Sequence, residues 1–291
     1  MSVTTGARRW LLAASALAVA VGFASPAAAA PSQPLEYVNL GDSFSAGSGV
    51  SPMAPTQISQ CWQSEQNFSH LVAQQLGYRL TDVSCGGAKT EDFYAPQYAG
   101  TRAQFDALTP TTELVTLMIG GNNNSTFAGA MASCIGAMVS TPGAQAPCRA
   151  QYGTSLADPI EAKTYPALVK ALRDIHERSP RAQVIIAGYP WLVPATGSCF
   201  PQLPLAPGDV QYLRELQASL NDAVRRAAQE TDTTFVDMSQ VSEGRDGCQP
   251  VGQRWIEPML NATQPVPVHP NADGERALAT EMMKAIGGQT G

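Results

Sequence analysis

Histidine is scarce in this sequence of 291 residues, and charge and metal-binding patterns are scarce as well. Three histidines occur, and charged residues make up 14% of the chain. There is no Cys-x-x-Cys pair and no cluster of cysteine with histidine, so a structural zinc site is not expected. The formal net charge of −6, without a basic patch, argues against a nucleic-acid partner. If the chemistry requires an imidazole, three side chains are the only candidates.

Long hydrophobic runs are also lacking. Near the amino terminus, Arg8 and Arg9 precede the apolar run LLAASALAVAVGF and then SPAAAA, which is the layout of a secretory signal peptide. A membrane span needs about 18 or more apolar residues, and this run is shorter. We therefore predict a cleaved signal peptide over residues 1–29, no transmembrane segment, and a secreted, extracellular mature chain over residues 30–291.

The cysteines form an even set behind this segment, which favours three disulfides in an oxidising compartment. The sequence alone does not choose among the many possible pairings. Pairing of neighbours along the chain would let each bridge close one local loop. The pairs expected on this basis are Cys61–Cys85, Cys134–Cys148 and Cys199–Cys248.

Short apolar strands alternate with helical patterns along the rest of the chain. Strands are expected at 35–40, 79–84, 113–120, 182–190 and 233–238, and helices at 64–77, 159–178, 209–231 and 272–287. The first of these helices would be capped by Ser64 and stopped by Gly77, and Pro166 would kink the second. Residues 125–158 are rich in Gly, Ala and Pro and are expected to form an irregular insertion pinned by a disulfide.

This alternation predicts βαβ units and hence an α/β fold, a three-layer α/β/α sandwich with a central, mainly parallel sheet. No internal repeat or linker is present, so residues 30–291 are expected to form a single domain. In such sheets, functional groups gather at the carboxyl ends of the strands. Those ends read GDS, CGG, GGNNN and YPW. Turn formation alone would explain any one of these Gly, Asn and Ser residues.

The three histidines differ in their surroundings. His70 and His176 lie within helical patterns, and the dipole of the helix explains the second of them without a function. His269 lies in QPVPVHPNADG, a loop before the last helix. Because loops carry function more often than helix faces do, His269 is the candidate base.

Acyl transfer would use the groups found at these strand ends. Ser43 follows the first strand, and a serine hydroxyl is a weak nucleophile unless a base takes its proton. Glycine N–H groups and an Asn amide could stabilise the developing oxyanion. No Gly-x-Ser-x-Gly elbow is present, so the usual α/β-hydrolase is not supported.

Four blocks in this order resemble the SGNH (GDSL-type) hydrolases: GDSFSAGSG after the first strand, CGGAKT, GGNNN, and the histidine before the last helix. The leading segment and the six cysteines look most like secreted actinobacterial lipases, phospholipases and esterases of that family. The resemblance covers the whole mature chain. It implies a flavodoxin-like sheet, Ser43 as the nucleophile and His269 as the base, with no metal and no cofactor.

The resemblance also implies an oxyanion hole made of the Ser43 N–H, the Gly87 N–H and the side-chain amide of Asn122. The neighbouring Gly86 and Asn123 are the alternatives in register. Gly87 is preferred because a small residue and a Thr-containing turn follow it, and Asn122 because its block reads Gly-x-Asn.

The sequence departs from the family pattern before the histidine. The family's catalytic acid normally lies three residues earlier, where this chain has Val266, and no carboxylate lies between Glu257 and Asp273. A triad acid orients the imidazole without taking the proton, and a backbone carbonyl can also orient it. We therefore expect a Ser43–His269 dyad, oriented by the Val266 carbonyl. The rival acid is Asp273, which is better placed to cap the last helix.

The chain is predicted to be a metal-independent serine ester hydrolase that acts as a monomer, either a lipase or an esterase, with phospholipase A as a further candidate activity. An acyl-ester or lipid substrate is expected, with a lipid interface as a candidate place of action, because Pro-, Ala- and Leu-rich loops surround the site and no basic patch suggests a phosphate clamp. Trp191, in one of these loops, could line an acyl pocket, but packing within the loop is the favoured explanation. The alternatives are a carbohydrate O-acetyl esterase of the same family and a secreted, non-catalytic binding module.

Overall fold

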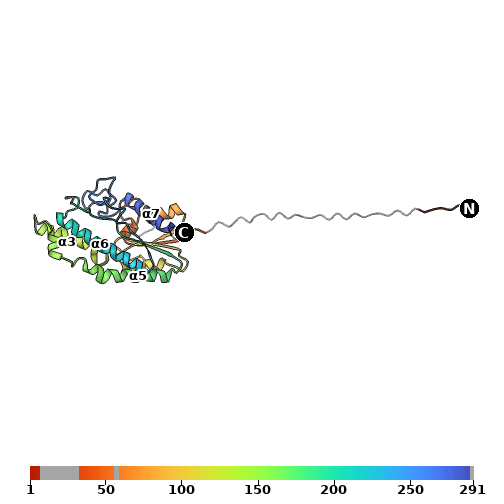
Figure 1. The fold of residues 1–291 in the computed structure, drawn as a ribbon, viewed down its shortest axis with the longest axis horizontal. Helices are drawn as coiled ribbons and strands as arrows, with labels where there is room; N and C mark the ends of the chain where they lie inside the picture. The colour runs from red at the N-terminus through yellow and green to blue at the C-terminus, as the bar shows by residue number, and fades with distance from the viewer. Residues whose placement is uncertain (7–32, 56–58, 289–291) are drawn as a thin grey trace. The chain divides into compact units, whose positions relative to one another are not determined.

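The computed structural model describes residues 1–6, 33–55 and 59–288. Apart from its first six residues, the expected signal peptide lies outside the described residues. The chain divides into two units, Met1–Gln33 and Pro34–Gly291, and every described helix and strand belongs to the second (Figure 1). Within the described ranges, no helix combines the length and apolarity needed to cross a membrane.

A five-stranded sheet in the order β2-β1-β3-β4-β5 forms the centre of this unit. Its strands are β1 (Glu36–Gly41), β2 (Arg79–Asp82), β3 (Leu114–Met118), β4 (Gln183–Ala187) and β5 (Thr234–Val236). All four strand pairings are parallel. This order is that of flavodoxin-like sheets, and it confirms the predicted α/β fold. The strand order reverses between β1 and β3, where ligands of such sheets bind.

Helices cover both faces of the sheet because alternate strand residues point to opposite sides. Leu114 of β3 lies in one apolar cluster and its neighbour Val115 in the other. Helices α2 (Phe68–Leu76) and α7 (Ala272–Gly287) contribute to the first cluster. Helix α5 (Tyr165–Arg178) and the carboxyl-terminal part of α6 (Pro207–Glu230) contribute to the second. Figure 1 shows α7 and α5 on opposite sides of the strands.

The expectation of an irregular segment over residues 125–158 is wrong. Two helices, α3 (Thr126–Ser140) and α4 (Pro147–Tyr152), occupy most of it. Met131 and Ile135 of α3 are spaced by one helical turn, and both line a cavity described below. Glycines in the same run weakened this periodic signal, while the alanines and methionines around them are strong helix formers.

The boundaries of two other helices also differ from expectation. Helix α2 begins at Phe68 rather than near Ser64, because Asn67 caps it by accepting a hydrogen bond from the His70 N–H. Gly77 ends this helix as expected. The turn before α5 is a π-helix (Ile160–Thr164), and Pro166 lies in the first turn of α5, where a missing N–H is harmless, instead of kinking the helix.

Short helical turns and disulfides fix the loops between these elements. A four-residue helix, α1 (Ser43–Ala46), follows β1. The 3₁₀ turns are η1 (Ser59–Cys61), η2 (Thr90–Phe93), η3 (Gln104–Ala107) and η4 (Asn123–Ser125). Disulfides join Cys61 to Cys85, Cys134 to Cys148 and Cys199 to Cys248. The second of these links α3 to α4, the two helices that were not predicted from the sequence, and so fixes them to each other.

Candidate active site

Ser43 begins helix α1 at the carboxyl end of β1. The turn into this helix needs glycine at position 41, where φ is +121° and a Cβ atom would lie 2.3 Å from the Met118 carbonyl oxygen. Asp42 caps the helix, with Oδ1 accepting a hydrogen bond from the Phe44 N–H at 2.9 Å. Ser43 is only 7% exposed. The cap and the glycine together fix the direction in which its hydroxyl points.

His269 meets this hydroxyl from the other end of the chain. Its Nε2 lies 2.7 Å from Ser43 Oγ, a contact between residues 226 positions apart. Its Nδ1 lies 2.8 Å from the carbonyl oxygen of Pro267. A carbonyl only accepts, so Nδ1 carries the proton and Nε2 is free to accept the proton of Ser43.

The carbonyl that faces the imidazole belongs to Pro267, so the expected contact with Val266 is wrong. The Val266 carbonyl accepts instead from Gln264 Nε2 at 3.3 Å. Val268 has a φ of +58°. This left-handed residue turns the chain back, so that the carbonyl two residues before the histidine, rather than three, meets its ring.

Asp273 lies apart from the imidazole contacts. It is in the first turn of α7, and its carboxylate pairs with Arg276 on the exposed side of that helix. The cap of α7 is Asn271, whose side chain accepts from the N–H groups of Asp273 and Gly274. The structure therefore places neither the expected carbonyl nor the rival carboxylate on His269 Nδ1.

The two glycines considered for the oxyanion hole differ in their hydrogen bonds. The Gly86 N–H donates to the Cys61 carbonyl at 2.7 Å. The Gly87 N–H has no acceptor in the part of the chain that the structure describes, and Gly87 is exposed. The N–H of Ser43 is likewise without an acceptor among those residues. Of the two glycines, Gly87 is the one with a donor available.

The two asparagines differ in the same way. Asn123 is buried, and its amide is used on both sides, donating to Thr90 Oγ1 at 2.7 Å and accepting from the Thr90 N–H at 3.1 Å. Asn122 donates one N–H to the Ala88 carbonyl at 3.1 Å and lines the same cavity as Ser43 and His269. Its second N–H remains available, and the contact with Ala88 ties it to the Gly87 turn.

A cavity of about 320 Å³ opens beside Ser43 and His269. Its walls come from α3, α6 and the loops that follow β4 and precede α7, and they are mostly apolar. The apolar lining includes Phe127, Met131, Ile135, Leu192, Val193, Leu213, Leu216, Met259 and Val268. No Lys or Arg is among the described residues that line it. The cavity can accommodate an apolar chain attached to a group at Ser43.

Trp191 does not line this cavity, so of the two expectations for it, packing within the loop holds. The guanidinium of Arg214 lies over its ring, 3.7 Å from the centroid, so the indole packs against a side chain of α6. The next two residues, Leu192 and Val193, reach the cavity in its place.

The sequence and geometry can now be set beside known proteins. The model of the GDSL-like lipase/acylhydrolase family matches residues 40–277, from the end of β1 into α7. The chain belongs to this family. The similar proteins include Lipase 2 of Streptomyces coelicolor, which is 54% identical over 92% of this chain and 90% of its own length. An esterase of Streptomyces scabiei is 30% identical over 96% and 94%. The chain is thus a carboxylic ester hydrolase.

Solved structures agree with the fold of this GDSL-family hydrolase. An extracellular lipase of Streptomyces rimosus superimposes with a TM-score of 0.71 at 26% identity, covering 86% of this chain and 99% of the other. Phospholipase A1 of Streptomyces albidoflavus gives 0.72 at 24% identity, covering 87% and 100%. The second likeness shows the fold alone.

Tyr189 joins three strand ends of the hydrolase, a role that was not predicted from the sequence. Its hydroxyl donates to Asp42 Oδ2 at 2.5 Å and accepts from the Gly121 N–H at 2.8 Å. Burial raises the pKa of Asp42 to about 7, although hydrogen bonds from Tyr189 and Phe44 oppose the rise. The strand-end tripeptide YPW marked the position, but only the folded chain shows that this tyrosine links the ends of β1, β3 and β4.

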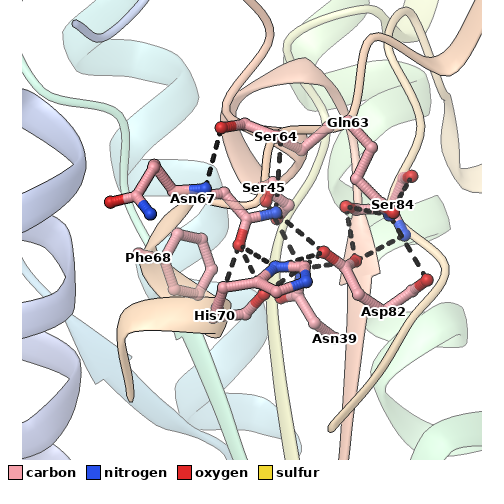
Figure 2. A network of polar contacts seen from close by, with 12 residues as sticks. Asn39, Ser45, Gln63, Ser64, Asn67, Phe68, His70, Asp82 and Ser84 are labelled. Atoms are coloured by element: carbon pink, nitrogen blue, oxygen red, sulfur yellow. Dashed lines mark hydrogen bonds and ion pairs between the residues drawn. The ribbon is translucent and has the colours of Figure 1, made fainter. Parts of the chain in front are cut away.

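A buried carboxylate, Asp82, supports helix α1, which carries Ser43, from the side of β2 (Figure 2). It accepts from Asn39 Nδ2 at 2.9 Å and from Asn67 Nδ2 at 2.7 Å. It also accepts from the N–H and hydroxyl of Ser84 at 3.0 and 2.7 Å. Figure 2 shows these donors converging on it from several segments.

The same two asparagines reach the carboxyl-terminal end of α1. Asn39 Nδ2 lies 3.3 Å from the Ser45 carbonyl, and Asn67 Nδ2 lies 3.3 Å from the Ala46 carbonyl. Asp82 therefore orients the side chains that hold the helix carrying Ser43. His70 belongs to this network through Asn67 Oδ1 at 2.9 Å, and neither it nor His176, which contacts Thr233, touches Ser43.

We predict that Asp82→Asn lowers the free energy of unfolding by about 3 kcal/mol or more, because an amide N–H₂ would face donors that the carboxylate now accepts from. Urea unfolding measures the change. The matched control is Asp106→Asn, which removes an exposed carboxylate 3.6 Å from Arg102 and should change stability by less than about 1 kcal/mol. Equal stabilities of the two variants would contradict the role given to Asp82.

We predict that His269 titrates below its ordinary pKa of 6.5, because burial lowers the pKa more than the hydrogen bond to Pro267 raises it. The imidazole is then neutral at pH 7. The rate of hydrolysis should rise with pH, with its midpoint at the lowered pKa of His269. With three histidines in the chain, a proton NMR titration resolves them, and His269→Ala assigns the signal. A midpoint for His269 above 6.5 would contradict the prediction.

Proposed function

We propose that this hydrolase cleaves acyl esters through an acyl-enzyme on Ser43. The observation that carries the proposal is the 2.7 Å contact of Ser43 Oγ with His269 Nε2 at the edge of an apolar cavity. As Oγ attacks the ester carbonyl carbon, His269 takes the hydroxyl proton and then passes it to the departing alcohol. Water activated by the same imidazole attacks the acyl-enzyme, which releases the acid and restores Ser43.

The oxyanion of each tetrahedral intermediate would be stabilised by the N–H of Ser43, the N–H of Gly87 and Nδ2 of Asn122. The absence of acceptors for the two backbone donors among the described residues supports this assignment. So does the position of Asn122 beside Ser43 in the cavity wall. Removing one such donor typically lowers the rate about 10²- to 10³-fold.

The imidazole would be oriented by the Pro267 carbonyl, so the catalytic unit is a dyad plus a backbone acceptor. The Nδ1 contact at 2.8 Å fixes the tautomer that the mechanism needs. A carbonyl stabilises the imidazolium less than a carboxylate does, because it carries only a partial charge.

A lipid or other long-chain acyl ester is the proposed substrate. The cavity beside Ser43 is lined mainly by aliphatic and aromatic side chains, which suit an acyl chain better than a sugar. The Streptomyces rimosus protein that it resembles in sequence and structure is described as a lipase. A carbohydrate O-acetyl esterase would instead require polar groups around a small site.

We also infer that the enzyme is secreted, with residues 1–29 removed and the remainder acting as one domain. The basic start and apolar run support this, as do the three disulfides, which persist in oxidising compartments. The related Streptomyces rimosus lipase is described as extracellular.

A fluorophosphonate should label Ser43 in the wild type and label it at least about 10²-fold more slowly in His269→Ala, because the hydroxyl then has no base. Mass spectrometry identifies the labelled peptide, and Ser43→Ala is the blank. His176→Ala is the matched histidine control and should react like the wild type. A wild type that hydrolyses no ester and takes up no label at Ser43 would overturn the proposal.

A series of p-nitrophenyl esters from acetate to laurate tests the substrate class. The cavity predicts a higher kcat/KM for butyrate or longer chains than for acetate, because added methylenes become buried there. An optimum at acetate with no hydrolysis at octanoate or beyond would favour the acetyl esterase instead. Release of fatty acid from phosphatidylcholine then distinguishes a phospholipase A from a lipase that acts on neutral esters.

A further inference from the structure

We propose that the buried ion pair of Arg254 with Glu257 positions His269, in a chain that lacks a carboxylate on the imidazole itself. This inference rests on the proposed role of His269 as the base. The pair precedes the histidine loop, and neither member touches the Ser43 hydroxyl or the imidazole among the contacts of the described residues.

Glu257 is almost completely enclosed. Its side chain is 1% exposed and that of Arg254 is 7% exposed. The guanidinium donates twice to the carboxylate, from Nε at 3.1 Å and from Nη2 at 2.6 Å. Such two-point contacts fix the orientation of both groups as well as their separation.

Two further donors reach the same carboxylate from other parts of the loop. The Thr263 N–H donates at 2.7 Å and Asn271 Nδ2 at 3.1 Å. Burial raises the pKa of Glu257, but the hydrogen bonds from Arg254, Thr263 and Asn271 outweigh it and the pKa is lowered. The ionised carboxylate of Glu257 thus binds both Thr263, in the middle of the loop, and Asn271, the cap of α7.

The main chain of Glu257 holds the histidine directly. Its N–H donates to the carbonyl oxygen of His269 at 2.9 Å, and its carbonyl accepts from the Val268 N–H at 3.0 Å. Two residues beyond His269, the Asn271 N–H donates to the Trp255 carbonyl at 2.8 Å. A displacement of Glu257 would therefore move the backbone on both sides of the Val268–His269 peptide bond.

A contribution to the stability of the fold does not by itself explain the buried pair of Arg254 with Glu257. Burying two charges carries a desolvation penalty, and apolar residues of similar size often stabilise a core as well or better. Directed hydrogen bonds, by contrast, hold a loop in one geometry. Val268 needs this support because it adopts a φ of +58°, which is unfavourable for a β-branched residue. That conformation turns the Pro267 carbonyl toward the imidazole.

The test is Glu257→Gln, which keeps the shape and main-chain bonds but turns an N–H₂ group toward neighbouring donors. We expect kcat for a short, soluble p-nitrophenyl ester to fall roughly 10- to 100-fold, as small misplacements of a catalytic group do. KM should stay within about twofold, because Glu257 does not line the cavity. Glu161→Gln is the matched control, since Glu161 is an exposed partner of Arg226, and it should leave kcat unchanged.

The rate is expressed per site that fluorophosphonate labels at saturation, so that misfolded protein is not counted. If Glu257→Gln does not fold, Asn271→Ser decides. Serine can still cap α7 but lacks the amide that donates to Glu257, and we expect kcat to fall at least about threefold at unchanged KM. A kcat per labelled site within twofold of the wild type in the folded variant would overturn the positioning role. Absence of labelling in the wild type would instead overturn the proposed function.

Discussion

The hydrogen bond between Ser43 and His269 is the constraint on which the rest of the structure depends. Its two residues lie 226 positions apart, so neither local sequence nor a single element can bring them together. The parallel sheet does so by ending β1 beneath the loop that leads into α7. Tyr189 then ties three of the strand ends to one another, and Asp82 orients Asn39 and Asn67, which hold the far end of the helix that carries Ser43.

The same contact explains why the acidic groups around the site are placed as they are. Asp42 caps the serine helix, and Glu257 braces the histidine loop; neither touches the imidazole. The proton on Nδ1 is directed by the Pro267 carbonyl alone among the described contacts. The carboxylates of Asp42 and Glu257 therefore affect the positions of Ser43 and His269. The charge of the imidazole is influenced instead by the dipole of the Pro267 carbonyl and by burial.

The sheet and the principal site residues were predictable because their signals are local. Most strands are short apolar runs, and Ser43 and Asn122 lie just after two of them, where turn residues mark the carboxyl ends. The scarcity of histidine then left one loop imidazole to consider. Helix α3 was missed because glycines diluted its periodicity, and its stability comes from packing and from the disulfide to α4.

The details that escaped prediction depend on tertiary contacts. Family spacing suggested the Val266 carbonyl, but the positive φ of Val268, held by the pairing with Glu257, presents Pro267 instead. Trp191 was one candidate for the cavity wall because it follows a strand end, but its ring packs under the guanidinium of Arg214. Both outcomes depend on contacts between separate segments of the chain, so no local sequence pattern predicts them.

The most direct test of the central claim, that a backbone carbonyl rather than a carboxylate orients the imidazole, is kcat/KM of Asp273→Asn. Asp273 is the first acid after the histidine, and in the structure it pairs with Arg276. The account predicts a value within about threefold of the wild type, as expected for an exposed ion pair. A loss of several thousandfold, as in a hydrolase deprived of its triad acid, would contradict it.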